Sequence, residues 1–228
     1  MTWRAIFAFV LVVMIAASIG MAVASVERSP GWVSYPGAAT ILREVWLTLV
    51  VYAGVIVVVV ANRGEAWDEE MRNAAAFGGT AGMVEAVNIV LENGIASVMN
   101  RPAVQIAAML VMFVLWGLAG ARTARRIHHF RPGVTAAVMS AGVCMVIAVT
   151  VGFALELFIA PPRPDFIETW PEFQRSGWMD AHAFGIANTL DSGFSQLWMG
   201  PAIALVVGSL GSWIGARQRQ PQKAASAG

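Results

Sequence analysis

The chain has 228 residues, of which 57% are hydrophobic and 13% are charged; its formal net charge is +1 and its mean hydropathy is +0.65. Soluble domains carry about 25% charged residues, so this composition excludes a water-soluble globular domain and indicates a protein of the lipid bilayer. The balanced charge argues against a nucleic-acid partner, which normally requires a clustered basic face.

Six stretches of the chain are long and apolar enough to be expected as membrane-spanning helices. A helix needs roughly 20 residues, each rising about 1.5 Å, to cross a hydrocarbon core of about 30 Å. In chain order, the predicted spans are 5–26, 45–61, 74–98, 103–121, 134–160 and 197–216. The sequence therefore predicts an all-α polytopic membrane protein with a single transmembrane domain over 1–216 and a basic, disordered tail over 217–228.

The first stretch also has features of a secretory signal peptide. Arg4 precedes the apolar run, and the sequence Ala22-Val23-Ala24 before Ser25 resembles a cleavage site. The run is longer than the usual apolar core of a signal peptide, which favours a retained anchor. Both interpretations stay open.

The third stretch, 74–98, is the least apolar of the six because it contains acidic and amide side chains. Glu85, Asn88 and Glu92 are spaced i, i+3 and i+7, so they lie on one face of a helix. A carboxylate at the centre of a bilayer costs about 3 kcal/mol on insertion scales, so it normally faces the bundle interior and takes part in function. The alternative is an interfacial or re-entrant helix, which leaves five spans and keeps both glutamates in water.

Further carboxylates fall near the predicted helix ends on the outer side. With six spans, Glu44, Glu92 and Glu156 lie at similar depth, and their convergence would form an electronegative vestibule suited to a cation. Arg43 or Arg101 would be internal counter-ions. In the alternative interpretation, Glu44 pairs with Arg43 or with headgroups, and Glu156 extends to the interface.

The predicted outer loop, 161–194, is unusually long for a connection in a compact bundle, and such loops are often functional. Its Trp and Phe residues are interleaved with charged residues, a pattern that suits a cap or amphipathic segments on the membrane surface. Asp180, His182 and Asp191 are candidate metal ligands or an acid–base pair, although their spacing matches no strong metal signature. The simpler interpretation is a solvated loop in which Asp180 caps a helix.

The distribution of Lys and Arg predicts the orientation, because cytoplasmic loops carry the excess. The strongest basic cluster lies at 122–131, and the second lies in the C-terminal tail. Six spans place ten of the 15 Lys and Arg residues inside and five outside, whereas five spans place nine inside and six outside. The sequence therefore predicts a multi-pass cell-membrane protein with both termini in the cytoplasm.

Small residues recur at four-residue spacing on two predicted spans. They are Ala16, Gly20 and Ala24 on the first span, and the pairs Gly208–Ser212 and Gly211–Gly215 on the last. Helices in a bilayer associate through close backbone approach at such residues. We expect these faces to join helices within the chain, or to join the chain to a second copy or to a partner subunit.

Two functions are consistent with these features. The first is a small transporter or channel component that binds or passes a cation or proton through Glu85, Asn88, Glu92, Glu44 and Glu156. The second is a non-catalytic accessory or scaffold subunit of a larger membrane complex.

Enzymatic function has less support in the sequence. Asp180 and His182 are the only residues in its favour, and no nucleophile elbow, zinc-protease motif or phosphate loop occurs. No cofactor is expected. The single Cys144 lies in an apolar run and is interpreted as a buried packing residue.

Overall fold

The computed structural model describes residues 2–34, 37–94, 101–161 and 163–218, and these residues form helices and no β-strand. Six helices are long and apolar enough to span a membrane. They are α1 (Trp3–Arg28), α2 (Ala38–Ala61), α3 (Glu65–Gly94), α4 (Arg101–Ile127), α5 (Phe130–Ala154) and α8 (Ala181–Arg217). The shorter helical segments are η1 (Pro30–Ser34), η2 (Leu155–Ile159), α6 (Pro164–Ile167) and α7 (Pro171–Ser176). The prediction of an all-α protein with six long apolar helices is confirmed.

All six long helices begin before the residues that hydropathy predicts, and the difference is largest at α3 and α8. α3 begins at Glu65 instead of residue 74, and α8 begins at Ala181 instead of residue 197. Hydropathy marks only the apolar part of a helix, whereas backbone hydrogen bonding continues through its polar residues. At α8, the Asp180 side chain accepts a hydrogen bond of 3.1 Å from the Ala183 amide and caps the helix. The predicted outer loop is therefore shorter, since residues 181–194 belong to α8.

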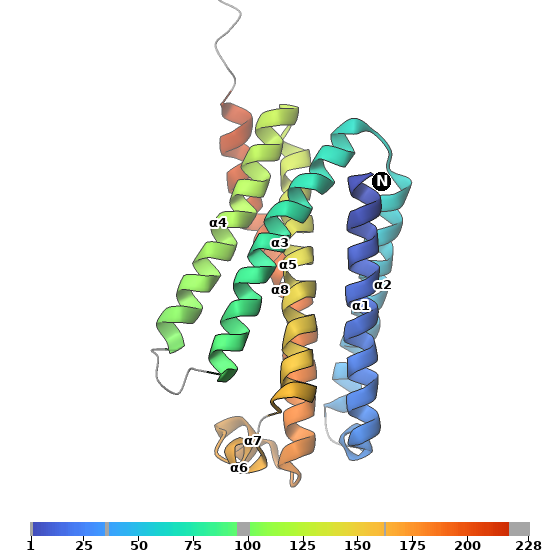
Figure 1. Ribbon diagram of the computed structural model, residues 1–228, viewed down its shortest axis with the longest axis vertical. Coiled ribbons are helices and arrows are strands. Elements are labelled where there is room, and N and C mark those ends of the chain that lie inside the picture. Colours follow the sequence, from blue (N-terminus) through green and yellow to red (C-terminus); the bar gives the residue numbers. More distant parts are fainter. Residues whose placement is uncertain (1, 35–36, 95–100, 162, 219–228) are drawn as a thin grey trace, which may run out of the picture.

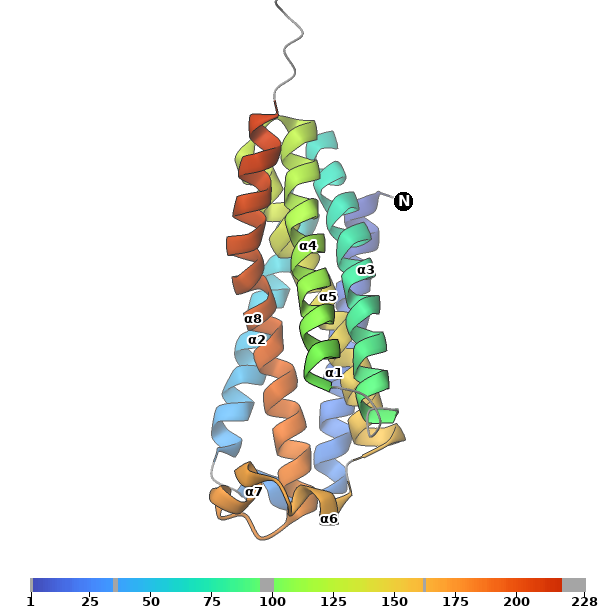
Figure 2. The same ribbon diagram turned by 90° about the vertical axis from the view of Figure 1, so that its left-hand side faces the viewer.

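The long helices divide into two groups (Figures 1 and 2). α3, α4, α5 and α8 form a four-helix bundle, and α1 and α2 form a hairpin that lies against it, mainly through α1 on α5 and α2 on α8. The described chain begins and ends at the same end of the molecule, which we call the terminal end. α6 and α7 lie across the opposite end, which we call the cap end.

Small residues bring α8 close to α4 at the terminal end. A Cβ atom at Gly211 would clash with the backbone of Gly117, and one at Gly215 would clash with the backbone of Ala121. The pair of small residues predicted at these positions therefore joins two helices within the chain.

The small-residue face of α1 is arranged differently. Ala16 and Gly20 are exposed, and among the described residues no atom lies within 4 Å of the position that a Cβ on Gly20 would take. This face takes no part in packing the described chain together.

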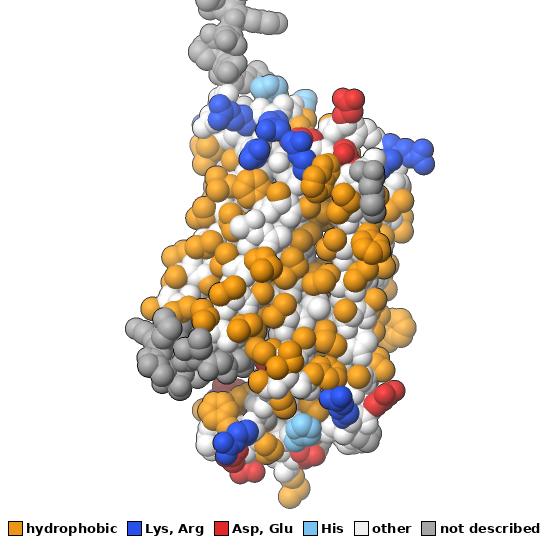
Figure 3. Space-filling view, in the orientation of Figure 1, with side chains coloured by type: hydrophobic (Ala, Val, Ile, Leu, Met, Phe, Trp, Pro, Cys, Tyr) orange, Lys and Arg blue, Asp and Glu red, His pale blue; other side chains and the backbone are white. Residues whose placement is uncertain are grey.

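Apolar side chains cover the middle of the molecule, and charged side chains gather at its two ends (Figure 3). Val50, Val57, Val114 and Leu210 belong to this apolar surface, and each is at least 60% exposed. Such a surface is unfavourable in water and suits a hydrocarbon environment. The surface pattern is compatible with a multi-pass membrane protein.

Candidate functional site

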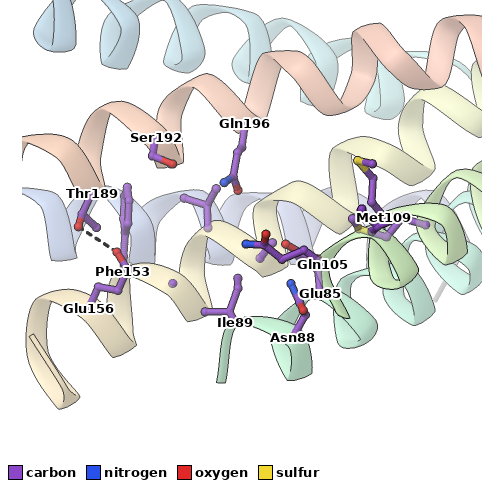
Figure 4. A pocket seen from close by; sticks show the side chains of 16 residues that line it. Glu85, Asn88, Ile89, Gln105, Met109, Phe153, Glu156, Thr189, Ser192 and Gln196 are labelled. Carbon is purple, nitrogen blue, oxygen red and sulfur yellow. Dashed lines mark hydrogen bonds between the residues drawn. The ribbon is translucent and has the colours of Figure 1, made fainter. Parts of the chain in front are cut away.

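A cavity of about 530 Å³ lies between α3, α4, α5 and α8, in the half of the bundle nearer the cap end (Figure 4). Its lining combines carboxylate, amide and hydroxyl groups with apolar side chains. The polar lining residues are Glu85, Asn88, Gln105, Glu156, Thr189, Ser192 and Gln196. The cavity therefore brings together three of the five residues predicted to bind a cation or proton, namely Glu85, Asn88 and Glu156.

α3 contributes Glu85 and Asn88 because it packs closely on α5 two to three turns earlier. A Cβ atom at Gly78 would clash with the Ser140 carbonyl, so only glycine permits this approach. Glu85 and Asn88 follow Gly78 along α3, share one face of the helix, and both line the cavity. The close contact at Gly78 thus directs the polar face of α3 into the bundle interior.

Asn88 is the most deeply buried polar residue contributed by α3 to the cavity. The residue is 7% exposed, and within the described part of the chain no group forms a hydrogen bond with its amide. Buried polar groups in proteins nearly always have a protein, water or ligand partner. The Asn88 amide is therefore available to a molecule inside the cavity.

Glu156 enters the cavity from a π-helical turn. η2 continues α5, and in it the Ala160 amide donates a hydrogen bond of 2.7 Å to the Leu155 carbonyl. Such wide turns are frequent at functional sites. The Thr189 hydroxyl of α8 donates a hydrogen bond of 2.9 Å to Oε2 of Glu156 (Figure 4). This bond orients the carboxylate where α5 and α8 meet at the cap end.

Four polar lining residues were not predicted from the sequence. Gln105 is the only amide or charged side chain in the predicted span 103–121, so its spacing defines no polar face. Thr189, Ser192 and Gln196 have the same i, i+3, i+7 spacing as the acidic stripe of α3. Hydropathy predicts these three residues in the outer loop or at its edge, where helical spacing is not expected.

The charge of the lining has one sign. It carries two carboxylates, and among the described lining residues there is no Lys, Arg or His. The amide and hydroxyl side chains add oxygen atoms that accept hydrogen bonds from a cation. Such a lining suits a positively charged ligand or a proton taken up by a carboxylate.

Glu44 lies outside this cavity. It is partly buried on α2, where its carboxylate interacts electrostatically with Asp191 of α8 and with Arg43. Its Oε2 atom is buried and has no hydrogen-bond partner among the described residues. The structure therefore does not bring Glu44 together with Glu156.

Two further predicted residues fall where side chains are not described. Glu92 is in the last turn of α3 and Arg101 is the first residue of α4, and the side chains of both lie outside the described residues.

The three candidates of the predicted outer loop are spread along α8. Asp180 is its N-cap, as the simpler interpretation of the loop predicted, and Asp191 is an exposed residue that interacts with α2. His182 lines a second cavity of about 170 Å³, which shares Glu156 and Thr189 with the first cavity. Within the described ranges, no three His, Cys, Asp or Glu side chains lie close enough together to hold a metal ion.

Comparison of the chain with protein-family models, with curated protein sequences and with solved structures finds no match. The class of the protein therefore follows from its own residues: an all-helical chain with six helices long and apolar enough to span a membrane, and a polar cavity between four of them.

Proposed function

We propose that the six long helices cross a membrane, with the terminal end in the cytoplasm and the cap end outside. The apolar surface between two charged ends supports this arrangement (Figure 3). With this topology, ten of the 15 Lys and Arg residues belong to the cytoplasmic side, as the positive-inside rule requires. Both termini then lie in the cytoplasm of a cell-membrane protein.

Cysteine labelling of intact and permeabilised cells tests this topology. In a Cys144→Ala background, we expect Arg175→Cys on α7 to react with an impermeant maleimide in intact cells. His129→Cys, in the turn between α4 and α5, should react only after permeabilisation. The opposite labelling pattern would show that the protein has the opposite orientation. Reaction of both positions in intact cells would contradict six crossings.

We propose that the protein is a small transporter or channel component that binds or passes a cation or proton through the cavity. The observation that carries this proposal is the convergence of Glu85, Asn88 and Glu156 in a lining without a described basic residue. Ionisable side chains at membrane depth are costly and are usually retained for ion binding or proton transfer. Glu92 belongs to the same proposal through its place on the acidic stripe of α3.

Flux measurements in liposomes test the proposal. We expect purified protein to conduct or exchange a monovalent cation or protons, and Glu85→Gln and Glu156→Gln to reduce the flux to the level of empty liposomes. Glu44→Gln is the matched control, because it removes a partly buried carboxylate that lies outside the cavity. Equal flux in all four proteins would overturn the proposal.

The second candidate function is a scaffold subunit of a membrane complex or a homo-oligomer. It is favoured by the exposed small residues Ala16 and Gly20 on α1, which permit close approach of another helix. Under this proposal, Gly20→Leu shifts the purified complex to a smaller size in native electrophoresis and leaves ion flux unchanged. If the size of the complex does not change, Ala16 and Gly20 no longer support a scaffold function.

A further inference from the structure

The size of the cavity restricts the ligands that suit it. Its volume of about 530 Å³ falls in the range of about 300–1,000 Å³ that is usual for small-molecule sites, whereas one water molecule occupies about 30 Å³ of liquid. A single dehydrated inorganic ion would occupy only a small part of this space. The volume therefore favours an organic ligand.

The two carboxylate-bearing residues of the cavity lie at different depths. α3 and α5 run in the same direction (Figure 1), and Ile89 of α3 lies opposite Gly152 of α5, with its Cδ1 atom 4.0 Å from the position of a Cβ on Gly152. Glu85 precedes Ile89 by one turn, and Glu156 follows Gly152 by one turn. At about 1.5 Å per residue, this register separates the two positions by about 12 Å along the helix axes.

On one side of the cavity, apolar side chains line the space between these two levels. Figure 4 shows Ile89 between Glu85 and Glu156 and Phe153 beside Glu156, while the polar side chains of Gln105, Ser192 and Gln196 lie along the same stretch. A ligand that reaches both carboxylates therefore passes an apolar wall formed by Ile89 and Phe153.

A third feature points to a ligand at the deeper carboxylate. Asn88 is one turn from Glu85 on the same face, the residue is buried, and within the described ranges its amide has no hydrogen-bond partner. An ammonium group has three N–H donors. The Glu85 carboxylate pairs with the positive charge of the ammonium group and accepts one hydrogen bond. The side-chain amide oxygen of Asn88 accepts a further one.

We propose that the cavity binds a linear organic dication, a diamine whose two ammonium groups contact Glu85 and Glu156 and whose methylene chain lies along Ile89 and Phe153. This inference rests on the proposed cation-binding function and names the class of its ligand. The positive ends match the two carboxylates, and the chain matches the apolar wall and the spacing between them.

Calorimetric titration of the purified protein tests this inference. The probes are diaminobutane, diaminohexane, diaminooctane and diaminodecane, each beside the alkylamine of the same chain length, with sodium and potassium chloride as inorganic cations. We expect an affinity optimum at diaminooctane, whose extended length approaches the axial separation of the two residue positions. Diaminooctane should bind about tenfold more tightly than octylamine, the gain from a second charged contact of about 1.4 kcal/mol.

Variants at the two carboxylates show whether both ends of the ligand are recognised. Glu85→Gln and Glu156→Gln should each reduce the affinity for diaminooctane to that for octylamine, while Glu44→Gln keeps the full difference. Thermal unfolding of each variant confirms that it is folded. A flat dependence on chain length, or equal affinity for diaminooctane and octylamine in the unmodified protein, would overturn the inference.

Flux data separate this inference from the function on which it rests. If flux of protons or inorganic cations depends on Glu85 and Glu156 but no diamine binds, the cation function stands and the diamine inference is overturned. If neither flux nor diamine binding depends on these residues, both are overturned.

Discussion

The two halves of the four-helix bundle are built differently, although the same four helices run through both. At the terminal end the helices meet at glycine: a Cβ at Gly133 of α5 would clash with the Gly120 carbonyl of α4, and one at Gly211 of α8 would clash with the Gly117 backbone. At the cap end the same helices carry Glu, Gln, Asn, Ser and Thr side chains and enclose the cavity. Residue size therefore decides which half is close-packed and which half is open.

This difference separates the requirements of folding from those of binding. Lipid competes with apolar side chains, so helices in a bilayer are held together by close packing at small residues and by interhelical hydrogen bonds. The terminal half provides such contacts, and the cap half can then tolerate a polar cavity. We therefore expect substitutions in the terminal half to change stability and substitutions in the cap half to change binding.

The largest effect is expected for Gly211→Leu. The new side chain has no space against the Gly117 backbone, so α8 and α4 must separate, and overpacking of this kind costs about 3 kcal/mol or more. Thermal unfolding in detergent should show a strongly lowered midpoint or no folded protein. Gly20→Leu on the exposed face of α1 is the control with the same chemical change, and an equal loss in both variants would contradict the role assigned to the terminal half.

Glu85→Gln is expected to have the next largest effect, and on binding only. It removes one charge from the cavity and keeps the size of the side chain, so we expect about tenfold weaker cation binding, equivalent to about 1.4 kcal/mol. The thermal midpoint should stay within a few degrees of that of the unmodified protein. A large drop in the midpoint without a change in binding would assign Glu85 to folding and erase the contrast between the halves.

Asn73→Val tests a polar contact in the terminal half. The Asn73 amide donates a hydrogen bond of 2.9 Å to the Thr123 hydroxyl, and both residues are buried between α3 and α4. Loss of this bond leaves a buried hydroxyl without its partner and should cost about 1 kcal/mol in the free energy of unfolding. The double variant Asn73→Val with Thr123→Val should recover part of the loss, and cation binding should not change in either protein.

The smallest effect is expected for Thr189→Val in the cap half. It removes the hydroxyl that orients Glu156, and one neutral hydrogen bond contributes about 1 kcal/mol. We expect about threefold to fivefold weaker cation binding with an unchanged thermal midpoint. Thr189→Ser keeps the hydroxyl and should bind like the unmodified protein; weak binding by the serine variant would show that the methyl group, not the hydrogen bond, is required.

The number of long helices could be predicted because crossing a bilayer imposes a minimum length and apolarity on each one. The start of α8 could not, because the residues after Asp180 include Asn188, Asp191 and Ser192, whose polarity conceals the helix from hydropathy. Their helical conformation depends on a capping bond and on packing against α5 and α6.

Part of the candidate site could be predicted from spacing. Glu85 and Asn88 share one face of one helix, which three-residue spacing is sufficient to predict. Gln105 has no comparable signal, because a single amide in an apolar span has many possible positions.

The sequence by itself determined the class of the protein, the six long apolar helices and the polar face of α3, because each of these follows from composition or from spacing within one helix. Only the tertiary structure decided that Glu156 and Thr189 share a cavity with Glu85, and that Glu44 lies beside Asp191 instead. The distance between residues on different helices depends on how closely those helices pack. In this protein that distance depends on glycine contacts between helices, such as Gly78 of α3 against Ser140 of α5, and the pattern along a single helix does not predict it.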